Sequence, residues 1–231
     1  MGAPNQSAYF PQDTVFSFRG GAFLMAEVGY TPNQKKGAAG LPGAYKFGAW
    51  YHTSSRFGDQ RFDNTGLSLA DPMSAGIPRD HSGNWGIYGV VDQMLYRVPG
   101  TDDQGLSAFA RVGGSPDDRN LISLYADGGL VYKGPIPGRP DDKIGIAAAY
   151  ARIGDNARGL DRDTSFFGGF FYPVRSSEAM IELTYQAKLA PWWTLQTDLQ
   201  YNIRPGGGVL NDDGRLRQNA WVFGLRSVLT F

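Results

Sequence analysis

The chain has 231 residues, with 22 basic and 22 acidic side chains and no cysteine. This balance leaves no overall field to attract nucleic acid, so we expect no nucleic-acid partner, and a disulfide framework or thiolate metal site is excluded. No apolar run approaches the roughly 18 residues of a membrane-spanning helix, whereas 32 glycines and 13% aromatic residues suit strands and turns. The composition therefore favours an all-β chain.

The first segment, residues 1–20, has no strand pattern. Residues 1–10 lack the basic stretch and apolar core of a secretory signal, so we expect a signal that has been removed or a chain that is incomplete. We expect residues 1–20 to form an irregular N-terminal segment.

Nine segments of alternating polarity follow, separated by clusters of Gly, Pro, Asp and Asn. Most have the roughly 9–11 residues, or slightly more, that a tilted strand needs to cross a bilayer, and soluble strands are usually shorter. We predict that residues 21–231 form part of an antiparallel transmembrane β-barrel of the outer membrane. The expected strands are 21–30, 43–54, 84–97, 105–114, 120–133, 143–153, 177–188, 192–203 and 218–231.

The alternation divides each segment into an apolar and a polar face. In the eighth segment Leu195 and Leu199 alternate with Gln196 and Asp198. We interpret the apolar face as meeting hydrocarbon and the polar face as meeting water, although a soluble β-sandwich also alternates and stays open as an alternative. Aromatic residues near strand ends favour the membrane because they predict two interfacial belts. These aromatic residues are Tyr132, Tyr185, Trp193 and Tyr201.

The connections between the segments alternate in length. Residues 55–83, 156–176 and 204–217 are long, whereas 98–104 and 189–191 are short. Outer-membrane barrels have long external loops and short periplasmic turns, so this pattern predicts the same orientation here. The short connection 115–119 is an exception, because it falls where a long loop is expected. The terminal Phe231 resembles the assembly signal of outer-membrane barrels.

Several stretches resemble the carbohydrate-selective porin family of the OprB type. They are LPGAYKFGAWYHT at 41–53, the stretch 83–93, and ELTYQAKLAPWWTLQTDLQY at 182–201, followed by PGG at 205–207 and NAWVFGLR at 219–226. The resemblance implies a barrel of about sixteen strands, so we interpret the nine strands as a C-terminal portion from a fragment or a shortened reading frame. Such a piece would be open, and its unpaired edges would be costly in lipid.

The resemblance also implies the function. We expect passive, carbohydrate-selective diffusion of small sugars through a water-filled pore, without catalysis and without a cofactor or a metal. A general porin is the near alternative, and a sugar-binding β domain is the distant one. The expected partners are outer-membrane lipid and small carbohydrates, and a homo-oligomer is left open.

If the polar faces point inward, they supply a mixed-charge wall with donors, acceptors and aromatic faces for sugar hydroxyls and C–H groups. For any one residue, solvation of an aqueous wall outweighs a specific sugar contact. Asp92 is placed inward rather than Gln93 because a carboxylate is costlier in lipid than an amide. The candidate pore-lining residues are Glu27, Lys46, Trp50, Asp92, Arg111, Asp127, Glu182, Gln196, Asp198, Gln200 and Arg226.

Other chemistry has little support in the sequence. Neither His52 nor His81 has a convincing Ser or Asp partner nearby in the chain, which argues against a hydrolase. A metal site from these histidines and loop acids is open, but solvation of the loop is the better interpretation. Glycines 206–208 predict a flexible external loop, because no Lys-Ser/Thr follows as a phosphate cradle requires. The loop acids in question are Asp59, Asp63, Asp71 and Asp80.

Overall fold

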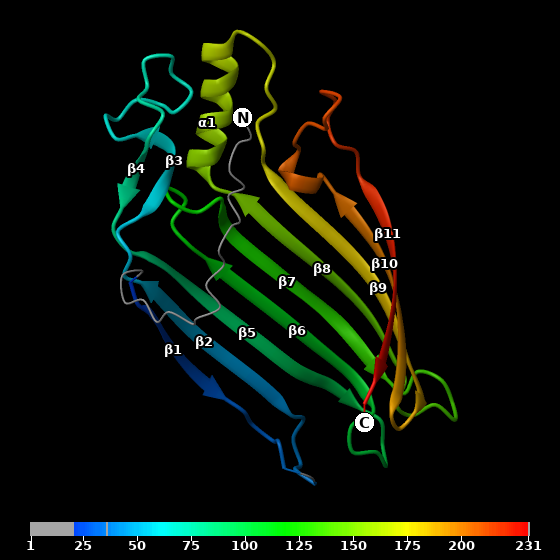
Figure 1. Ribbon diagram of the computed structural model, residues 1–231. Coiled ribbons are helices and arrows are strands. Elements are labelled where there is room, and N and C mark those ends of the chain that lie inside the picture. The colour runs from blue at the N-terminus through cyan, green and yellow to red at the C-terminus, as the bar shows by residue number, and fades with distance from the viewer. Residues whose placement is uncertain (1–20, 36, 231) are drawn as a thin grey trace, which may run out of the picture.

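The computed structural model describes residues 21–35 and 37–230. The irregular segment expected at 1–20 and the terminal Phe231 lie outside the described residues. Nine long strands form one antiparallel sheet in the order β1-β2-β5-β6-β7-β8-β9-β10-β11 (Figure 1). Each predicted strand agrees with an observed one to within two residues at either end. The strands are β1 (Phe23–Tyr30), β2 (Gly43–His52), β5 (Asn84–Arg97), β6 (Gly105–Gly114), β7 (Ile122–Lys133), β8 (Lys143–Ile153), β9 (Ser177–Ala190), β10 (Trp193–Ile203) and β11 (Ala220–Leu229).

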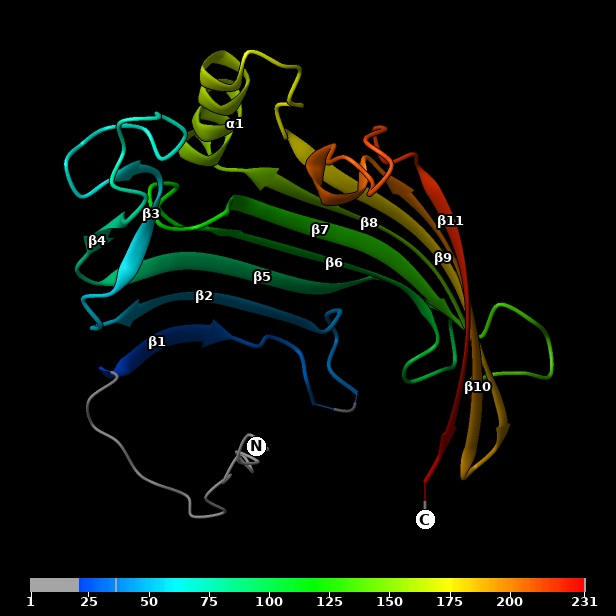
Figure 2. The same ribbon diagram turned by 45° about the horizontal axis from the view of Figure 1, so that its top comes forward.

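The sheet curves into an open trough (Figure 2), with β1 and β11 at its two edges. Each strand pairs with its neighbour in the order, and every pairing is antiparallel. Within residues 21–35 and 37–230, the barrel architecture is therefore present as a nine-stranded, unclosed part. None of the helices within 21–35 and 37–230 is long and apolar enough to cross a bilayer.

The apolar face of the sheet is an outer surface. Ile181, Leu183 and Leu199 expose 47%, 49% and 41% of their surface, so they do not lie in a dry core. Exposure alternates in the same way on β8, where Ile144 and Ile146 are exposed and the intervening Gly145 is half-buried. Side chains diverge on the convex side of a curved sheet, so the more exposed apolar face is the convex one. A membrane barrel, whose apolar residues face outward, has this arrangement.

Aromatic side chains gather near both ends of the apolar face. At one end the rings of Tyr201 and Trp221 lie 4.6 Å apart, on paired positions of β10 and β11. At the other end the rings of Tyr30 and Tyr45 stack at 6.2 Å, again on paired positions. Trp193 lies at this second end and donates a hydrogen bond of 2.9 Å to Ser227. The sheet thus has the two aromatic belts that the sequence predicted.

The connections fall into two sets. We call the end of the sheet with residues 53–83, 115–121, 154–176 and 204–219 the loop end, and the end with 31–42, 98–104, 134–142 and 191–192 the turn end. The short connection around 115–119 therefore lies at the loop end, as the alternation requires. The asymmetry in length is incomplete, because 31–42 and 134–142 at the turn end are longer than 115–121.

The long loops contain regular structure that the sequence pattern does not predict. β3 (Phe57–Asp63) and β4 (Pro78–His81) form a second, two-stranded sheet, and α1 (Asp155–Gly168) stands at the loop end (Figure 1). The helix has signals at both termini: Asp155 lies in the first turn, and the left-handed Gly169 donates its N–H to the carbonyl of Ser165. Pro205–Gly207 forms a tight turn in which Gly206 and Gly207 adopt positive φ angles.

Candidate functional site

All eleven predicted pore-lining residues lie on one face of the nine-stranded sheet. Directly paired positions of neighbouring strands share a face, so the register can be followed across the sheet. Glu27 is opposite Gly48, on the same side as Lys46 and Trp50, and Arg111 is opposite Asp127. At the other edge Glu182 is opposite Gln200 and Gln196 is opposite Arg226. The intervening pairings connect these groups through Ala44↔Asp92, Asp92↔Phe109, Asp127↔Ala149, Ala147↔Glu182 and Thr184↔Asp198.

Near the β1 edge, a charged pair is held between three strands. The ammonium of Lys46 lies 3.1 Å from Glu27, and the hydroxyl of Tyr88 donates a hydrogen bond of 2.7 Å to the same carboxylate. The ring of Tyr88 crosses Gly48, where a side chain would collide with it. A glycine at this position therefore lets the tyrosine reach across β2 to β1.

Trp50 is positioned in the same way. A Cβ at Gly86, the partner of Trp50 on β5, would lie 2.6 Å from the indole nitrogen. Any residue other than glycine would therefore collide with the ring. Phe23 stacks on Trp50 at 5.9 Å. The inner face at this edge thus presents aromatic surface beside the Lys46–Glu27 pair.

In the middle of the sheet, Arg111 donates a hydrogen bond of 2.8 Å to Asp127. The aspartate side chain is only 5% exposed and the arginine side chain 57%, so the cation projects from the wall. The guanidinium also lies 5.7 Å from the ring centre of Phe109. Phe109 shares the polar face with Arg111 and Asp92, but an isolated phenylalanine among polar residues gives no signal of its role in the sequence.

Toward β11 the side chains form a hydrogen-bonded ladder. Gln200 and the hydroxyl of Thr184 each donate a bond of 2.7 Å to Glu182. On the same face Gln196 donates a bond of 2.7 Å to Asp198. The donors to Glu182 and Asp198 are all neutral side chains. The ladder therefore presents carboxylate, amide and hydroxyl groups, which can accept hydrogen bonds from a ligand and donate them to it.

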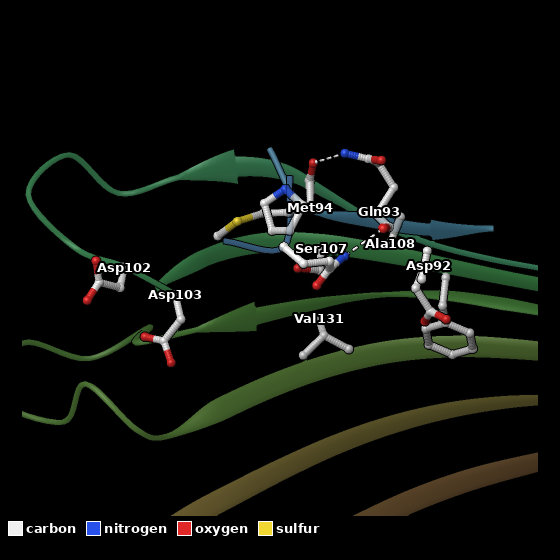
Figure 3. A pocket seen from close by; sticks show the side chains of 13 residues that line it. Asp92, Gln93, Met94, Asp102, Asp103, Ser107, Ala108 and Val131 are labelled. Atoms are coloured by element: carbon white, nitrogen blue, oxygen red, sulfur yellow. Dashed lines mark hydrogen bonds between the residues drawn. The ribbon is translucent and has the colours of Figure 1, made fainter. Parts of the chain in front are cut away.

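This face has several hollows, and two of them lie beside candidate residues. One of about 310 Å³ lies over β8, whose inward positions are small, between Phe109 and the polar groups Glu182, Thr184 and Gln196. The other, of about 430 Å³, lies at the turn end between β5, β6 and β7 (Figure 3), where Asp92 and Ser107 are among its lining residues. A wall of this kind can exchange hydrogen bonds with hydroxylated solutes and stack against their apolar faces.

The sequence of residues 4–231 matches the model of the carbohydrate-selective porin, OprB family. The chain belongs to this family. Porin B of Pseudomonas aeruginosa is 31% identical over 199 residues, covering 81% of this chain and 42% of that protein. The putative porin QuiX of Acinetobacter baylyi is 26% identical over 223 residues, covering 91% of this chain and 45% of that protein.

A solved structure supports the same assignment. The high-pH structure of Pseudomonas putida OprB is similar with a TM-score of 0.81 and 29% identity, covering 92% of this chain and 49% of that chain. This OprB-family chain therefore spans about half the length of the relatives it matches. Membership of the family places the chain in the bacterial outer membrane, which confirms the location expected from the strand pattern.

At the loop end of this OprB-family chain, folding gives His81 two acidic neighbours that the sequence does not place beside it. Its Nε2 lies 2.8 Å from the carboxylate of Asp59, and its Nδ1 lies 3.7 Å from that of Asp118. The partners are remote in the sequence, which is why no acidic partner was recognised. Asp59 also accepts hydrogen bonds from Arg79 and from the backbone N–H of Arg61. The carboxylate thus holds the loop together through its hydrogen bonds.

Hydrogen bonding also determines the ionisation of the loop carboxyls. Burial would raise the pKa of Asp59, but the backbone of Phe62 and Arg61 and the side chains of His81 and Arg79 outweigh it and hold the pKa below its ordinary value. Asp63 is fully buried, and burial again opposes ionisation, but bonds from Ser74, Thr65 and nearby backbone N–H groups place its pKa far below the ordinary value. These acids therefore stay ionised at neutral pH and organise the loop around them.

Proposed function

We propose that this chain forms part of the wall of a water-filled pore that conducts small neutral sugars by passive diffusion along their concentration gradient. The observation that carries the proposal is the gathering of all eleven polar candidates on one face of a sheet whose other face is apolar and exposed. Their role as pore-lining residues follows from this proposal.

The chemistry of the polar face suits neutral, hydroxylated solutes. Several charges are paired within the wall, as in Lys46–Glu27 and Arg111–Asp127, which reduces the field that an ion would feel beside them. Carboxylate, amide and hydroxyl groups remain along the face to accept and donate hydrogen bonds. Trp50 and Phe109 supply apolar ring surface against which the C–H face of a sugar can stack.

Swelling of liposomes tests the proposal. Liposomes containing the purified chain are placed in isosmotic glucose or in an amino acid of matched size, and the rate of swelling is measured by light scattering. We expect faster swelling in glucose. Equal rates would indicate a general porin, and no swelling above protein-free liposomes would contradict conduction by this chain altogether.

A pair of variants locates the selectivity on the inner face. Phe109→Ala removes ring surface from the wall, so we expect the preference for glucose over the amino acid to fall. Leu183→Val is the control, because Leu183 lies on the exposed apolar face and its replacement leaves the inner wall intact. A preference unchanged by Phe109→Ala would remove this ring from the proposed sugar path.

A further inference from the structure

A cavity with an excess of lysine lies at the turn end of the inner face. Its volume is about 350 Å³, and it is lined by Lys133, Asp141, Lys143, Gln186, Lys188 and Thr194. Lys133 is opposite Lys143, Lys143 is opposite Gln186, and Lys188 is opposite Thr194, so these residues share the face of the eleven pore-lining candidates. None of the six belongs to that set.

The lysines of this cavity differ in their partners. Lys133 is neutralised by two carboxylates, because its ammonium pairs with Asp103 and lies 3.2 Å from Asp141. Lys143 and Lys188 have no side-chain hydrogen bond or ion pair with any residue that the structure describes. Two ammonium groups therefore border one cavity without a counter-ion from this part of the chain, and an amide and a hydroxyl stand beside them.

Asp142, a further acid near the cavity, does not compensate them. Asp142 is only 1% exposed, and its carboxylate accepts bonds from Arg139, from the hydroxyl of Tyr185 and, at 2.9 Å, from the backbone N–H of Lys188. That last bond fixes the backbone from which the Lys188 side chain extends. The buried Asp142 carboxylate thus supports the position of the Lys188 ammonium, while its own charge is already hydrogen-bonded to other donors.

The lysine cavity continues into the hollow over β8. Lys143 and Gln186 line both, and the hollow extends from them to Glu182, Gln196 and the ring of Phe109. A ligand that lies across the two would meet cations at one end and hydrogen-bonding groups with an aromatic face at the other. We propose that this composite site binds hydroxylated carboxylic acids of the sugar-acid class, with the carboxylate between Lys143 and Lys188.

The inference rests on the proposed function only in taking this face as the wall of an aqueous pore. It adds a substrate class, because a neutral sugar can use the hydroxyl contacts but gives the two lysines no anion. Charge-assisted hydrogen bonds to a carboxylate are stronger than those between neutral groups, so the acid is the preferred ligand. The attraction between partly exposed charges is screened by salt, so binding weakens as ionic strength rises.

Calorimetric titration of the purified chain in an uncharged detergent tests the site. The probes are gluconate, glucitol and acetate: glucitol keeps the hydroxyl chain without the carboxylate, and acetate keeps the carboxylate without the hydroxyls. We expect gluconate to bind about tenfold or more tightly than either probe at low salt. Equal affinity for gluconate and glucitol, or no detectable gluconate binding, would overturn the proposal.

Variants assign the binding to the two lysines. Lys143→Gln and Lys188→Gln are each expected to weaken gluconate binding by about tenfold while leaving glucitol binding unchanged. Lys35→Gln is the matched control, because it removes the same charge from the turn between β1 and β2. An equal loss in Lys35→Gln would show a general field effect and contradict the site.

Further controls distinguish a failure of the lysine site from a failure to fold and from a failure of the pore proposal. Each variant is first shown to be folded by its heat-modifiable gel migration, and Lys143→Arg and Lys188→Arg, which retain the charge, are expected to keep gluconate binding. A chain that swells liposomes in glucose but does not bind gluconate refutes only the lysine site. A chain that binds gluconate but conducts no glucose refutes only the pore proposal.

Discussion

Arg61 on β3 and Asp163 on α1 are 102 positions apart, and two hydrogen bonds of 2.8 and 3.1 Å join the guanidinium to the carboxylate. The hydroxyl of Ser68 donates a further bond of 2.7 Å to the same carboxylate. The loop between β2 and β5 is therefore fastened to the helix between β8 and β9. The two long loops form one assembly over the end of the sheet, and this assembly can be tested separately from the strands.

Replacing the bidentate partner should loosen this assembly. We expect Arg61→Lys to lower the free energy of local opening by about 1 kcal/mol, because a lysine cannot form two parallel bonds to Asp163 and the pair is partly exposed. Native-state hydrogen exchange of α1 and β3 measures the change. Arg215→Lys is the control, since its pair with Asp213 is 3.9 Å long and both groups are exposed. Equal effects of the two variants would contradict the structural role of Arg61.

Acid should loosen the same loops before it affects the strands. Although burial raises the pKa of Asp163, bonds from Arg61 and Ser68 outweigh it, so its folded pKa lies below the ordinary value, as for Asp59 and Asp63. The folded state then binds fewer protons than the unfolded one, so the stabilisation is present above the unfolded pKa of about 4 and is lost as pH falls toward the folded values.

Hydrogen exchange at pH 7 and pH 3 checks this expectation, with rates corrected for the intrinsic dependence of exchange on pH. Protection should fall in residues 55–83 and in α1, and it should persist in β6, β7 and β8, whose pairings depend on backbone hydrogen bonds. Uniform loss of protection across loops and strands would show that the carboxylates do not act locally.

The two faces of the sheet meet different media, so arginine substitutions at adjacent positions of β10 should have opposite effects on stability. Leu199→Arg should destabilise the protein in lipid by about 2–4 kcal/mol, because the side chain lies on the exposed apolar face. Gln200→Arg should be tolerated, since its guanidinium would lie beside Glu182 on the polar face. Folding into lipid vesicles, followed by heat-modifiable gel migration, measures both. Equal tolerance of arginine at 199 and 200 would contradict the assignment of the two faces.

A methyl group at Gly129 should disturb the wall beneath Phe109. A Cβ there would lie 2.9 Å from the ring of Phe109 and 2.5 Å from the carbonyl oxygen of Ile146. We expect Gly129→Ala to lower stability by about 1–3 kcal/mol, because the backbone neighbour cannot move aside easily. Gly89→Ala is the control, since its Cβ would meet Val112 only at 3.8 Å. The temperature at which each variant loses its folded gel migration should separate the two, and matching temperatures would remove the steric argument.

The sequence by itself determined the strands, their two faces and the family. A period of two is local: Leu199 and Gln200 point to opposite sides in any β-strand, whatever the neighbours are. Repetition of this pattern over strands of about ten residues predicted the positions of all nine strands of the sheet and the parity of the eleven pore-lining candidates. The resemblance in residues 41–53 and 182–226 then identified the family.

Only the tertiary structure decided which residues of different segments meet. The fold brings together three pairs of residues that are distant in the sequence, and no local period encodes these distances. The pairs are Asp59 with His81, Arg61 with Asp163, and Phe109 with Glu182 around the β8 hollow. The same holds for the lysine cavity, because Lys143 and Lys188 become neighbours only when β8 and β9 pair. The helix α1 was missed because its polar residues bury little surface by themselves, and packing against the β3 loop gives it a partner.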